Sequence, residues 1–264
     1  MRLIRFTSPG GTANGILEGD QIVEIEGDFF SEWKRTARTH ALSAVKIELP
    51  FIPRTFYAAG FNYSRHVLEA AKLQGSTISL PTTADIGYRA NNALIAHDEE
   101  VVIPGDAGEA IQYEGELAVV IGKKSRNVSE EQAMQCVMGY TIGNDVSERG
   151  WQKQDRTFFR CKNSDTFKPM GPWIETELDL QAARTTVRVN GVQTIRFATN
   201  EMLFGIATFI SRTSRYCTLW PGDVMWMGTD GTSPNIKHGD VVEIEISGIG
   251  VLRNRFVRES SSVG

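Results

Sequence analysis

The chain is divided into short apolar runs that alternate with Gly, Pro and Asn, and this pattern constrains its fold more than any other feature. Beyond residue 50, nine such runs occur, at residues 93–96, 100–103, 111–121, 138–144, 171–176, 184–189, 224–227, 241–246 and 251–257. Runs of this length with turn residues between them indicate short strands. The pattern predicts a mixed α+β fold that is mainly β, curved and largely antiparallel.

Three segments have the character of helices, at residues 63–73, 129–137 and 201–211. The second begins with Ser129 and has Gln132 three positions later, which is the spacing of a capping box at a helix N-terminus. Because only three segments have this character, helices are expected to be few.

Two prolines mark a boundary near residue 50. The residues before it hold short strand-like runs at 3–6, 16–17 and 21–26. Pro50 and Pro53 then precede a further apolar run, which is typical of a linker followed by a strand. We predict a small β-rich N-terminal domain over 1–50, a larger domain over 51–258 and a frayed tail over 259–264.

The charge balance excludes several classes of partner. The chain has 28 Lys and Arg against 32 Asp and Glu, a formal net charge of -4, so it offers no general field for nucleic acid or anionic membranes. No apolar stretch approaches the ~20 residues of a membrane-spanning helix, and the N-terminus lacks the apolar core of a secretory signal. We expect a cytoplasmic protein with no nucleic-acid partner and no membrane partner.

Two of the three Glu-x-Glu pairs in the sequence fit solvated strand faces. Around Glu24 and Glu26, and again around Glu243 and Glu245, acidic and apolar residues alternate. Such alternation is typical of a strand with one face exposed to solvent and the other buried against the core. These two pairs are expected to carry no chemistry.

The third pair, Glu114 and Glu116, stands at the start of a continuously apolar run, which predicts a strand buried on both faces. Two carboxylates at the mouth of such a strand lose water and repel each other, so they need a cation at neutral pH. Gly115 between them leaves room for a ligand or another backbone. Asp145 ends another apolar run and is the expected third carboxylate, with an ion pair to the nearby Arg149 as the alternative.

The ligand chemistry of this cluster favours a hard cation. Three carboxylates leave room for further oxygen ligands around a divalent ion. The three cysteines show no paired spacing, which argues against a disulfide framework or structural zinc, and the histidines lie far away in sequence. The sequence therefore predicts Mg²⁺ or Mn²⁺ rather than Zn²⁺ or Cu²⁺.

His66 and Glu69 are three residues apart, so they share one face of the expected helix. A glutamate bonded to one imidazole nitrogen would fix the tautomer and leave the other nitrogen as a general base. The alternative is an exposed helix pair without a role. Lys162 lies in a polar segment, where a solvated loop lysine is the alternative to a functional one.

Six motifs follow one another along the chain: Gly60-Phe-Asn-Tyr-Ser-Arg-His66, Tyr113-Glu-Gly-Glu116, Gly143-Asn-Asp-Val-Ser-Glu-Arg149 with Gln152, Lys162 with Asp165-Thr-Phe167 and Gly171-Pro172, Pro221-Gly-Asp223 before Gly228-Thr229, and His238-Gly-Asp240 before Gly248-Ile-Gly250. In this order they resemble the fumarylacetoacetate hydrolase family, in its acylpyruvase and 2-hydroxyhepta-2,4-diene-1,7-dioate isomerase-like branch. The resemblance covers roughly residues 52–258.

The resemblance implies a β-roll core, a homodimer and a small 2-oxo acid substrate. It places Mg²⁺ or Mn²⁺ on Glu114, Glu116 and Asp145. It also implies that the substrate is held by Arg149, Gln152 and Thr229, that His66 and Glu69 activate a water from a lid, and that Lys162 lies beside the metal.

Four departures from the family pattern bear on the substrate. Gly150 stands where many members carry Asp, Arg89 where Lys is common, Lys168 where a small residue is usual, and Asn163-Ser164 where Gly or an aromatic residue is often found. If either Arg89 or Lys168 faces the pocket, its charge would suit a second carboxylate on the substrate.

The expected activity is hydrolysis of a C–C bond in an acylpyruvate or fumarylpyruvate type of 2-oxo acid through a metal-stabilised enolate. Isomerisation or decarboxylation of 2-hydroxy-dienedioates, or decarboxylation of oxaloacetate, passes through a similar enolate and stays open as the alternative. A binding or scaffold protein that keeps the fold without catalysis is the rival from another class.

Overall fold

The computed structural model describes residues 1–74 and 79–259, and it is mainly β, as the sequence predicts. The strands are β1 Arg2–Ser8, β2 Gly11–Glu18, β3 Gln21–Gly27, β4 Trp33–Ala41, β5 Lys46–Ile47, β6 Phe56–Ala59, β7 Ile86–Tyr88, β8 Leu94–Ile95, β9 Glu100–Ile103, β10 Ile111–Gln112, β11 Gly115–Ile121, β12 Val137–Asn144, β13 Ser147–Glu148, β14 Lys168–Glu175, β15 Arg184–Val189, β16 Val192–Ala198, β17 Val224–Trp226, β18 Val241–Ile246 and β19 Gly250–Arg258. The α-helices are α1 Ser64–Gln74, α2 Glu130–Ala133, α3 Arg149–Gln152, α4 Phe159–Asn163 and α5 Ile206–Tyr216, and short 3₁₀ turns cover Leu42–Ala44, Asn91–Ala93 and Met134–Cys136.

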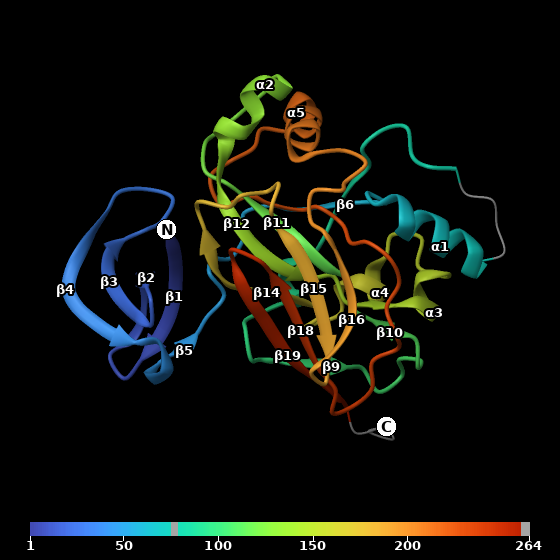
Figure 1. Cartoon of the computed structure of the whole chain (residues 1–264), viewed down its shortest axis with the longest axis horizontal. Coiled ribbons are helices and arrows are strands. Elements are labelled where there is room, and N and C mark those ends of the chain that lie inside the picture. The colour runs from blue at the N-terminus through green and yellow to red at the C-terminus, as the bar shows by residue number, and fades with distance from the viewer. Residues whose placement is uncertain (75–78, 260–264) are drawn as a thin grey trace.

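The first five strands lie together at one side of the molecule (Figure 1). β1 to β4 pair in sequence order as an antiparallel meander. β4 was not expected, because most of its residues are polar and exposed and show no strict alternation. Its Arg38 and His40 cover Glu24, whose side chain is only 13% exposed, so the expectation of a solvated Glu24 is wrong.

One large sheet runs through the molecule in the order β4-β3-β2-β1-β14-β12-β11-β17-β6-β7. β1 pairs with β14 through Arg2↔Glu175 and Leu3↔Ile174, so the N-terminal strands continue the sheet of the larger part. β11 is buried along its whole length between β12 and β17, as its unbroken apolar run predicts.

A second sheet, in the order β16-β15-β18-β19-β9, packs near the start of β11. A Cβ atom at Gly115 would lie 3.0 Å from Ile244 Cγ2 and 3.1 Å from Val187 Cγ2. Glycine at 115 therefore allows the second sheet to approach the carboxylate pair closely. β18 alternates half-buried and buried residues, as expected around Glu243 and Glu245.

Each of the three predicted helical segments contains a helix, though not with the predicted bounds, and the short helices α3 and α4 were not predicted. α1 starts one residue later than predicted. At the N-terminus of α2 the expected capping box is present, and the Ser129 N–H donates to Gln132 Oε1 (3.3 Å). α5 starts at residue 206 instead of 201, because Asn62 holds the preceding segment as a loop: the Phe204 N–H donates to Asn62 Oδ1 (2.9 Å) and the Leu203 N–H to the Asn62 carbonyl (2.8 Å).

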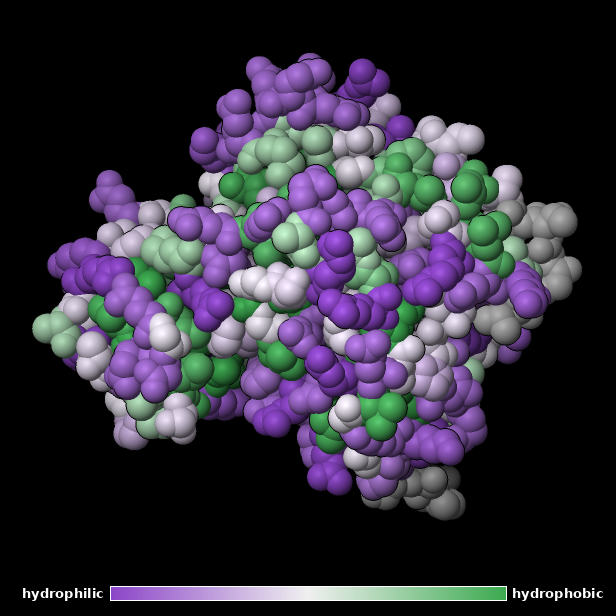
Figure 2. All heavy atoms as spheres, in the orientation of Figure 1, coloured by the Kyte–Doolittle hydropathy of each residue, from purple (hydrophilic) through white to green (hydrophobic). Residues whose placement is uncertain are grey.

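The surface seen in Figure 2 is mostly hydrophilic, with apolar residues scattered in small groups. Among the described residues, no helix is long and apolar enough to cross a membrane.

The three cysteines are unpaired: Cys136 and Cys161 are buried, and Cys217 is partly exposed. The predicted tail falls largely outside the described residues, although the Glu259 N–H still donates to the Ile103 carbonyl (3.0 Å).

Candidate active site

Glu114, Glu116 and Asp145 form a buried carboxylate cluster, with one oxygen of each lying within 4.8 Å of the others. Pairing of β11 with β12 sets Gly115 opposite Asn144, so the residues at the start of one strand meet the residue after the other. The Asp145 N–H donates to the Glu114 carbonyl (2.9 Å), which fixes this register at the site.

The cluster fits a hard divalent cation. Its donors are carboxylate oxygens, which Mg²⁺ and Mn²⁺ prefer. Burial, together with the charges of Asp145 and Glu114, raises the pKa of Glu116 to about 8, and neither Lys162 nor the Gly228 N–H (2.6 Å) offsets this. A divalent ion at this position would stabilise the ionised Glu116.

Two cations act on Glu114. Lys162 Nζ, from α4, lies 2.5 Å from Glu114 Oε2 and 2.7 Å from Asp145 Oδ2, and its burial excludes the solvated loop alternative. Arg149 Nη2 donates to Glu114 Oε1 (2.6 Å). Burial alone would raise the pKa of Glu114, but Lys162 and Arg149 outweigh it and lower this pKa to about 2.

Asp145 is paired with Arg89 and Lys168 as well as Lys162. Arg89 Nη2 donates to Asp145 Oδ2 (2.8 Å), and Lys168 Nζ lies 2.8 Å from Oδ1. These cations lower the pKa of Asp145 well below its usual range despite complete burial. The ion pair considered from the sequence thus exists, but Arg89 makes it and not the neighbouring Arg149.

Arg89 and Lys168, which the sequence offered as additional cations for a substrate carboxylate, both pair with Asp145 in the structure. Lys168 is fully buried, and its three ammonium hydrogens reach Asp145, the Val146 carbonyl (2.9 Å) and the Phe167 carbonyl (2.9 Å). The Arg89 side chain is 8% exposed and turned to Asp145. Both residues supply counter-charge to a carboxylate of the cluster.

The predicted substrate-binding residues come from two parts of the structure, α3 and the turn after β17. Arg149 and Gln152 lie on α3, where Arg149 Nη1 donates to Gln152 Oε1 (2.7 Å). Thr229 is buried in the turn after β17, directly behind the Gly228 N–H that bonds Glu116. With Arg89, Arg149, Lys162 and Lys168, four cations face three carboxylates, which leaves one positive charge in excess when all are ionised. That balance favours an anionic ligand.

His66 reaches the cluster from α1, with Nε2 at 3.9 Å from Glu114 Oε1. Its Nδ1 contacts the Gly231 carbonyl oxygen, and among the described residues no hydrogen bond joins His66 to Glu69. The turn at Gly231, which has a φ of +65°, brings that carbonyl to the helix. A backbone carbonyl therefore occupies the place expected for the Glu69 carboxylate.

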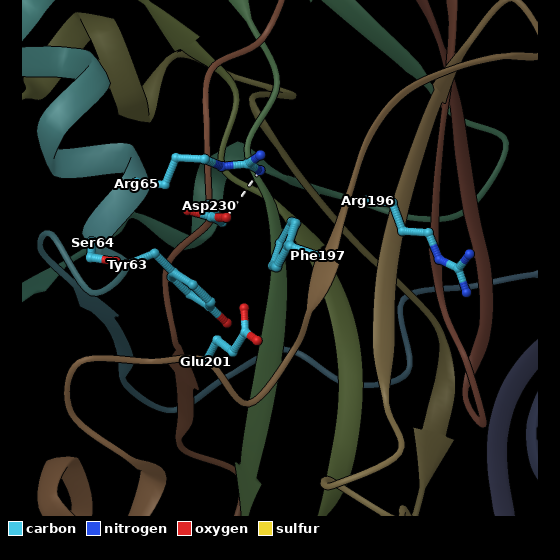
Figure 3. Close-up of a pocket in the computed structure, with 7 residues that line it drawn as sticks. All are labelled: Tyr63, Ser64, Arg65, Arg196, Phe197, Glu201 and Asp230. Carbon is cyan, nitrogen blue, oxygen red and sulfur yellow. Dashed lines mark ion pairs between the residues drawn. The ribbon is translucent and has the colours of Figure 1, made fainter.

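A second contact holds α1 to the same turn. Arg65 Nη2 lies 3.0 Å from Asp230 Oδ2 at the edge of a cavity of about 270 Å³ (Figure 3). In Figure 3, Arg65 reaches across to Asp230 while Arg196 points away. Thr229 in this turn was singled out from the sequence, but both Asp230 and the carbonyl of Gly231 were missed.

The comparisons with known proteins cover both parts of the chain. Residues 55–257 match the family described as the C-terminal domain of fumarylacetoacetate (FAA) hydrolase, and residues 1–50 match one described as Rv2993c-like, N-terminal. The 2,4-didehydro-3-deoxy-L-rhamnonate hydrolase of Sphingomonas sp. (strain SKA58) is 34% identical over 97% of this chain and 95% of its own length.

Two solved structures show the same architecture. The 2-hydroxyhepta-2,4-diene-1,7-dioate isomerase from Mycobacterium marinum has a TM-score of 0.89 and 34% identity over 99% of this chain and 100% of its own. The maleylpyruvate hydrolase from Sphingobium sp. SYK-6, in complex with manganese (II) ion and pyruvate, has a TM-score of 0.79 and 26% identity over 98% and 100%. The carboxylate cluster, the mainly β fold and these matches agree, and they show that the chain belongs to the enzymes of the fumarylacetoacetate hydrolase family.

Proposed function

We propose that the protein is a metal-dependent hydrolase that cleaves a C–C bond in a small 2-oxo acid of the acylpyruvate or fumarylpyruvate type. The observation that carries this proposal is the buried cluster of Glu114, Glu116 and Asp145 with His66 Nε2 3.9 Å from Glu114 Oε1. It supports a role for His66 as a base beside a site for Mg²⁺ or Mn²⁺. The matched hydrolases support this reading.

The three carboxylates would hold the cation, which when bound supplies Lewis-acid stabilisation of the negative charge that develops as the C–C bond breaks. Lys162 keeps Glu114 and Asp145 ionised for this purpose. Arg149 and Gln152 from α3, and Thr229 from the turn after β17, would bind and orient the substrate carboxylate. The excess positive charge of the cluster favours the approach of such an anion.

His66 has the arrangement of a general base. When Nδ1–H donates to the Gly231 carbonyl, Nε2 carries the lone pair and faces the cluster. Nε2 would take the proton from the water that attacks the carbonyl of the departing acyl group. The role of Glu69 that the sequence predicted would then be secondary to that of the carbonyl.

The second candidate is isomerisation, tautomerisation or decarboxylation at the same site. Relatives include an oxaloacetate tautomerase of Bacillus subtilis and a bifunctional isomerase/decarboxylase of Salmonella dublin. Decarboxylation needs the metal and the enolate but no attacking water. His66→Ala should therefore abolish hydrolysis while sparing decarboxylation.

The test is a panel of acylpyruvates, hydroxy-dienedioates and oxaloacetate, assayed with Mg²⁺, with Mn²⁺ and after chelation. We expect acylpyruvate cleavage that chelation removes and metal restores, and a loss in His66→Ala on the order of 10²–10⁴-fold in kcat. Glu69→Gln is the matched control, and retained activity there would favour Gly231 as the partner of His66. Decarboxylation without acylpyruvate cleavage would favour the second candidate, and absence of Mn²⁺ binding would exclude both.

A homodimer and a cytoplasmic location stay predictions. Analytical ultracentrifugation of the full chain tests the first, because a dimer and a monomer differ twofold in mass. Fractionation of cells that express the protein tests the second.

A further inference from the structure

A fourth buried carboxylate, that of Glu148, lies outside the metal cluster and has no part in the steps above. Glu148 is 1% exposed and ends β13, directly before α3. Its Oε1 accepts the Gly150 N–H (3.1 Å) and its Oε2 accepts the Trp151 N–H. Among the described residues it forms no ion pair, so these backbone donors account for its burial.

The space for this carboxylate depends on two glycines. A Cβ atom at Gly150 would lie 3.0 Å from Oε1 and 3.1 Å from Oε2 of Glu148, and a Cβ atom at Gly108 would lie 3.1 Å from Oε1. These distances are shorter than nearly all contacts of real Cβ atoms. Any side chain at position 150 would therefore press on the Glu148 carboxylate.

The segment that Glu148 caps carries two of the candidate substrate-binding groups. α3 spans only Arg149–Gln152, and so short a helix has little stability of its own. Its first residue, Arg149, donates through Nε to Gln112 Oε1 (2.8 Å) and through Nη2 to Glu114 Oε1 (2.6 Å). The direction in which α3 leaves β13 therefore decides whether Arg149 and Gln152 reach the cluster.

We infer that Glu148 is a positioning residue: by capping α3 in the space that Gly150 leaves, it aims Arg149 and Gln152 at the substrate carboxylate. Glu148 need not touch the substrate itself. The inference rests on the proposed function for the identity of the ligand, whereas the capping contacts stand on the geometry alone.

The first arm of the test compares Glu148→Ala, Glu148→Gln and Glu109→Ala by steady-state kinetics with Mn²⁺ and the best 2-oxo acid of the panel. We expect Glu148→Ala to raise KM about tenfold with a smaller change in kcat, since mainly substrate binding is lost. Glu148→Gln keeps an acceptor oxygen and should recover part of the loss. Glu109 is an exposed carboxylate near the same loop, so Glu109→Ala should change nothing.

The second arm exchanges the position of the carboxylate. Gly150→Asp alone should raise KM, because its side chain crowds the Glu148 carboxylate. Glu148→Ala/Gly150→Asp should lower KM again relative to either single variant, because a single acidic group then has the space and the unpaired N–H donors to itself. Equal KM values in wild type and Glu148→Ala, or a double variant as poor as the sum of both singles, would overturn the inference.

A readout independent of catalysis separates this inference from the proposed function. Amide exchange at Gly150 and Trp151 should accelerate in folded Glu148→Ala, and oxalate binding to the Mn²⁺ form should weaken. If the wild type cleaves no 2-oxo acid but these two changes occur, the proposed function fails and the positioning role stands. If exchange and oxalate binding are unchanged, the positioning role fails whatever the activity.

Discussion

Lys168 Nζ lies 2.8 Å from Asp145 Oδ1, and both side chains are almost completely buried. Lys168→Met removes the charge and keeps most of the volume, so Asp145 loses one of its three cations. We expect the free energy of unfolding to fall by about 3 kcal/mol, as for other broken buried pairs. The KM for the substrate at saturating Mn²⁺ should stay within about twofold, because Lys168 is fully buried and its ammonium group contacts Asp145 and two backbone carbonyls. Urea unfolding and kinetics check both, with the exposed Lys153→Met as control; a large rise in KM alone would contradict the assignment.

Asp230→Asn removes the charge that holds Arg65 and therefore one of two contacts between α1 and the turn at Gly231. We expect kcat for hydrolysis to fall about tenfold, since small displacements of a catalytic group are costly. Glu201→Gln is the matched control, because Glu201 lines the same cavity but forms no ion pair among the described residues (Figure 3). Equal losses in the two variants would show that the cavity, and not the ion pair, matters.

Gly143→Ala should destabilise the protein. A Cβ atom at 143 would lie 2.7 Å from three ring atoms of Trp226, which is fully buried. Overpacking of this kind costs roughly 1–3 kcal/mol, and the denaturation midpoint should fall accordingly. Gly87→Ala is the control, since its nearest neighbouring atom would lie 3.8 Å away. An unchanged midpoint in Gly143→Ala would mean that β12 and Trp226 move apart freely.

Glu24 should give the N-terminal strands an acid-sensitive contribution. Hydrogen bonds from Arg38, and secondarily from His40, lower the pKa of Glu24 to about 2 against burial. A carboxylate with a lowered folded pKa stabilises the fold above its unfolded value near 4.5, and this stabilisation is lost as the pH falls towards 2. The difference in unfolding free energy between wild type and Glu24→Gln should thus shrink between pH 5 and pH 2.

Urea unfolding at a series of pH values from about 6 to 2.5 measures this difference. The exposed Glu26→Gln serves as control, because its side chain is 67% exposed and its ion pair with Lys34 lies in solvent. A Glu24→Gln difference that does not vary with pH would contradict the prediction.

The carboxylate cluster could be predicted from sequence because a local pattern encodes it. The apolar run after Glu116 shows a strand buried on both faces, and Asp145 ends a second such run. Neighbouring buried strands tend to pair, so their ends meet. Local patterns likewise predicted the solvent-facing side of β18 and the capping box at Ser129.

Contacts between distant segments could not be predicted. Nothing near His66 indicates that the carbonyl of Gly231, 165 residues away, takes the place of Glu69. Arg89 and Lys168 both pair with Asp145, and no local pattern in the sequence indicates that pairing. β4 was missed because an edge strand lacks the burial that creates alternation.

The pairing of β1 with β14 has a consequence for any shortened form of the protein. β14 lies between β1 and β12, and Leu3 packs with Ile174 and Met170 in one core. Without residues 1–50, the peptide groups of β14 at Ile174 and Glu175 would lose their partners and that apolar surface would face water. A bare strand edge of this kind recruits strands from other molecules. By pairing with β14, the N-terminal strands cover this edge of the sheet that carries the active site and so reduce its tendency to aggregate.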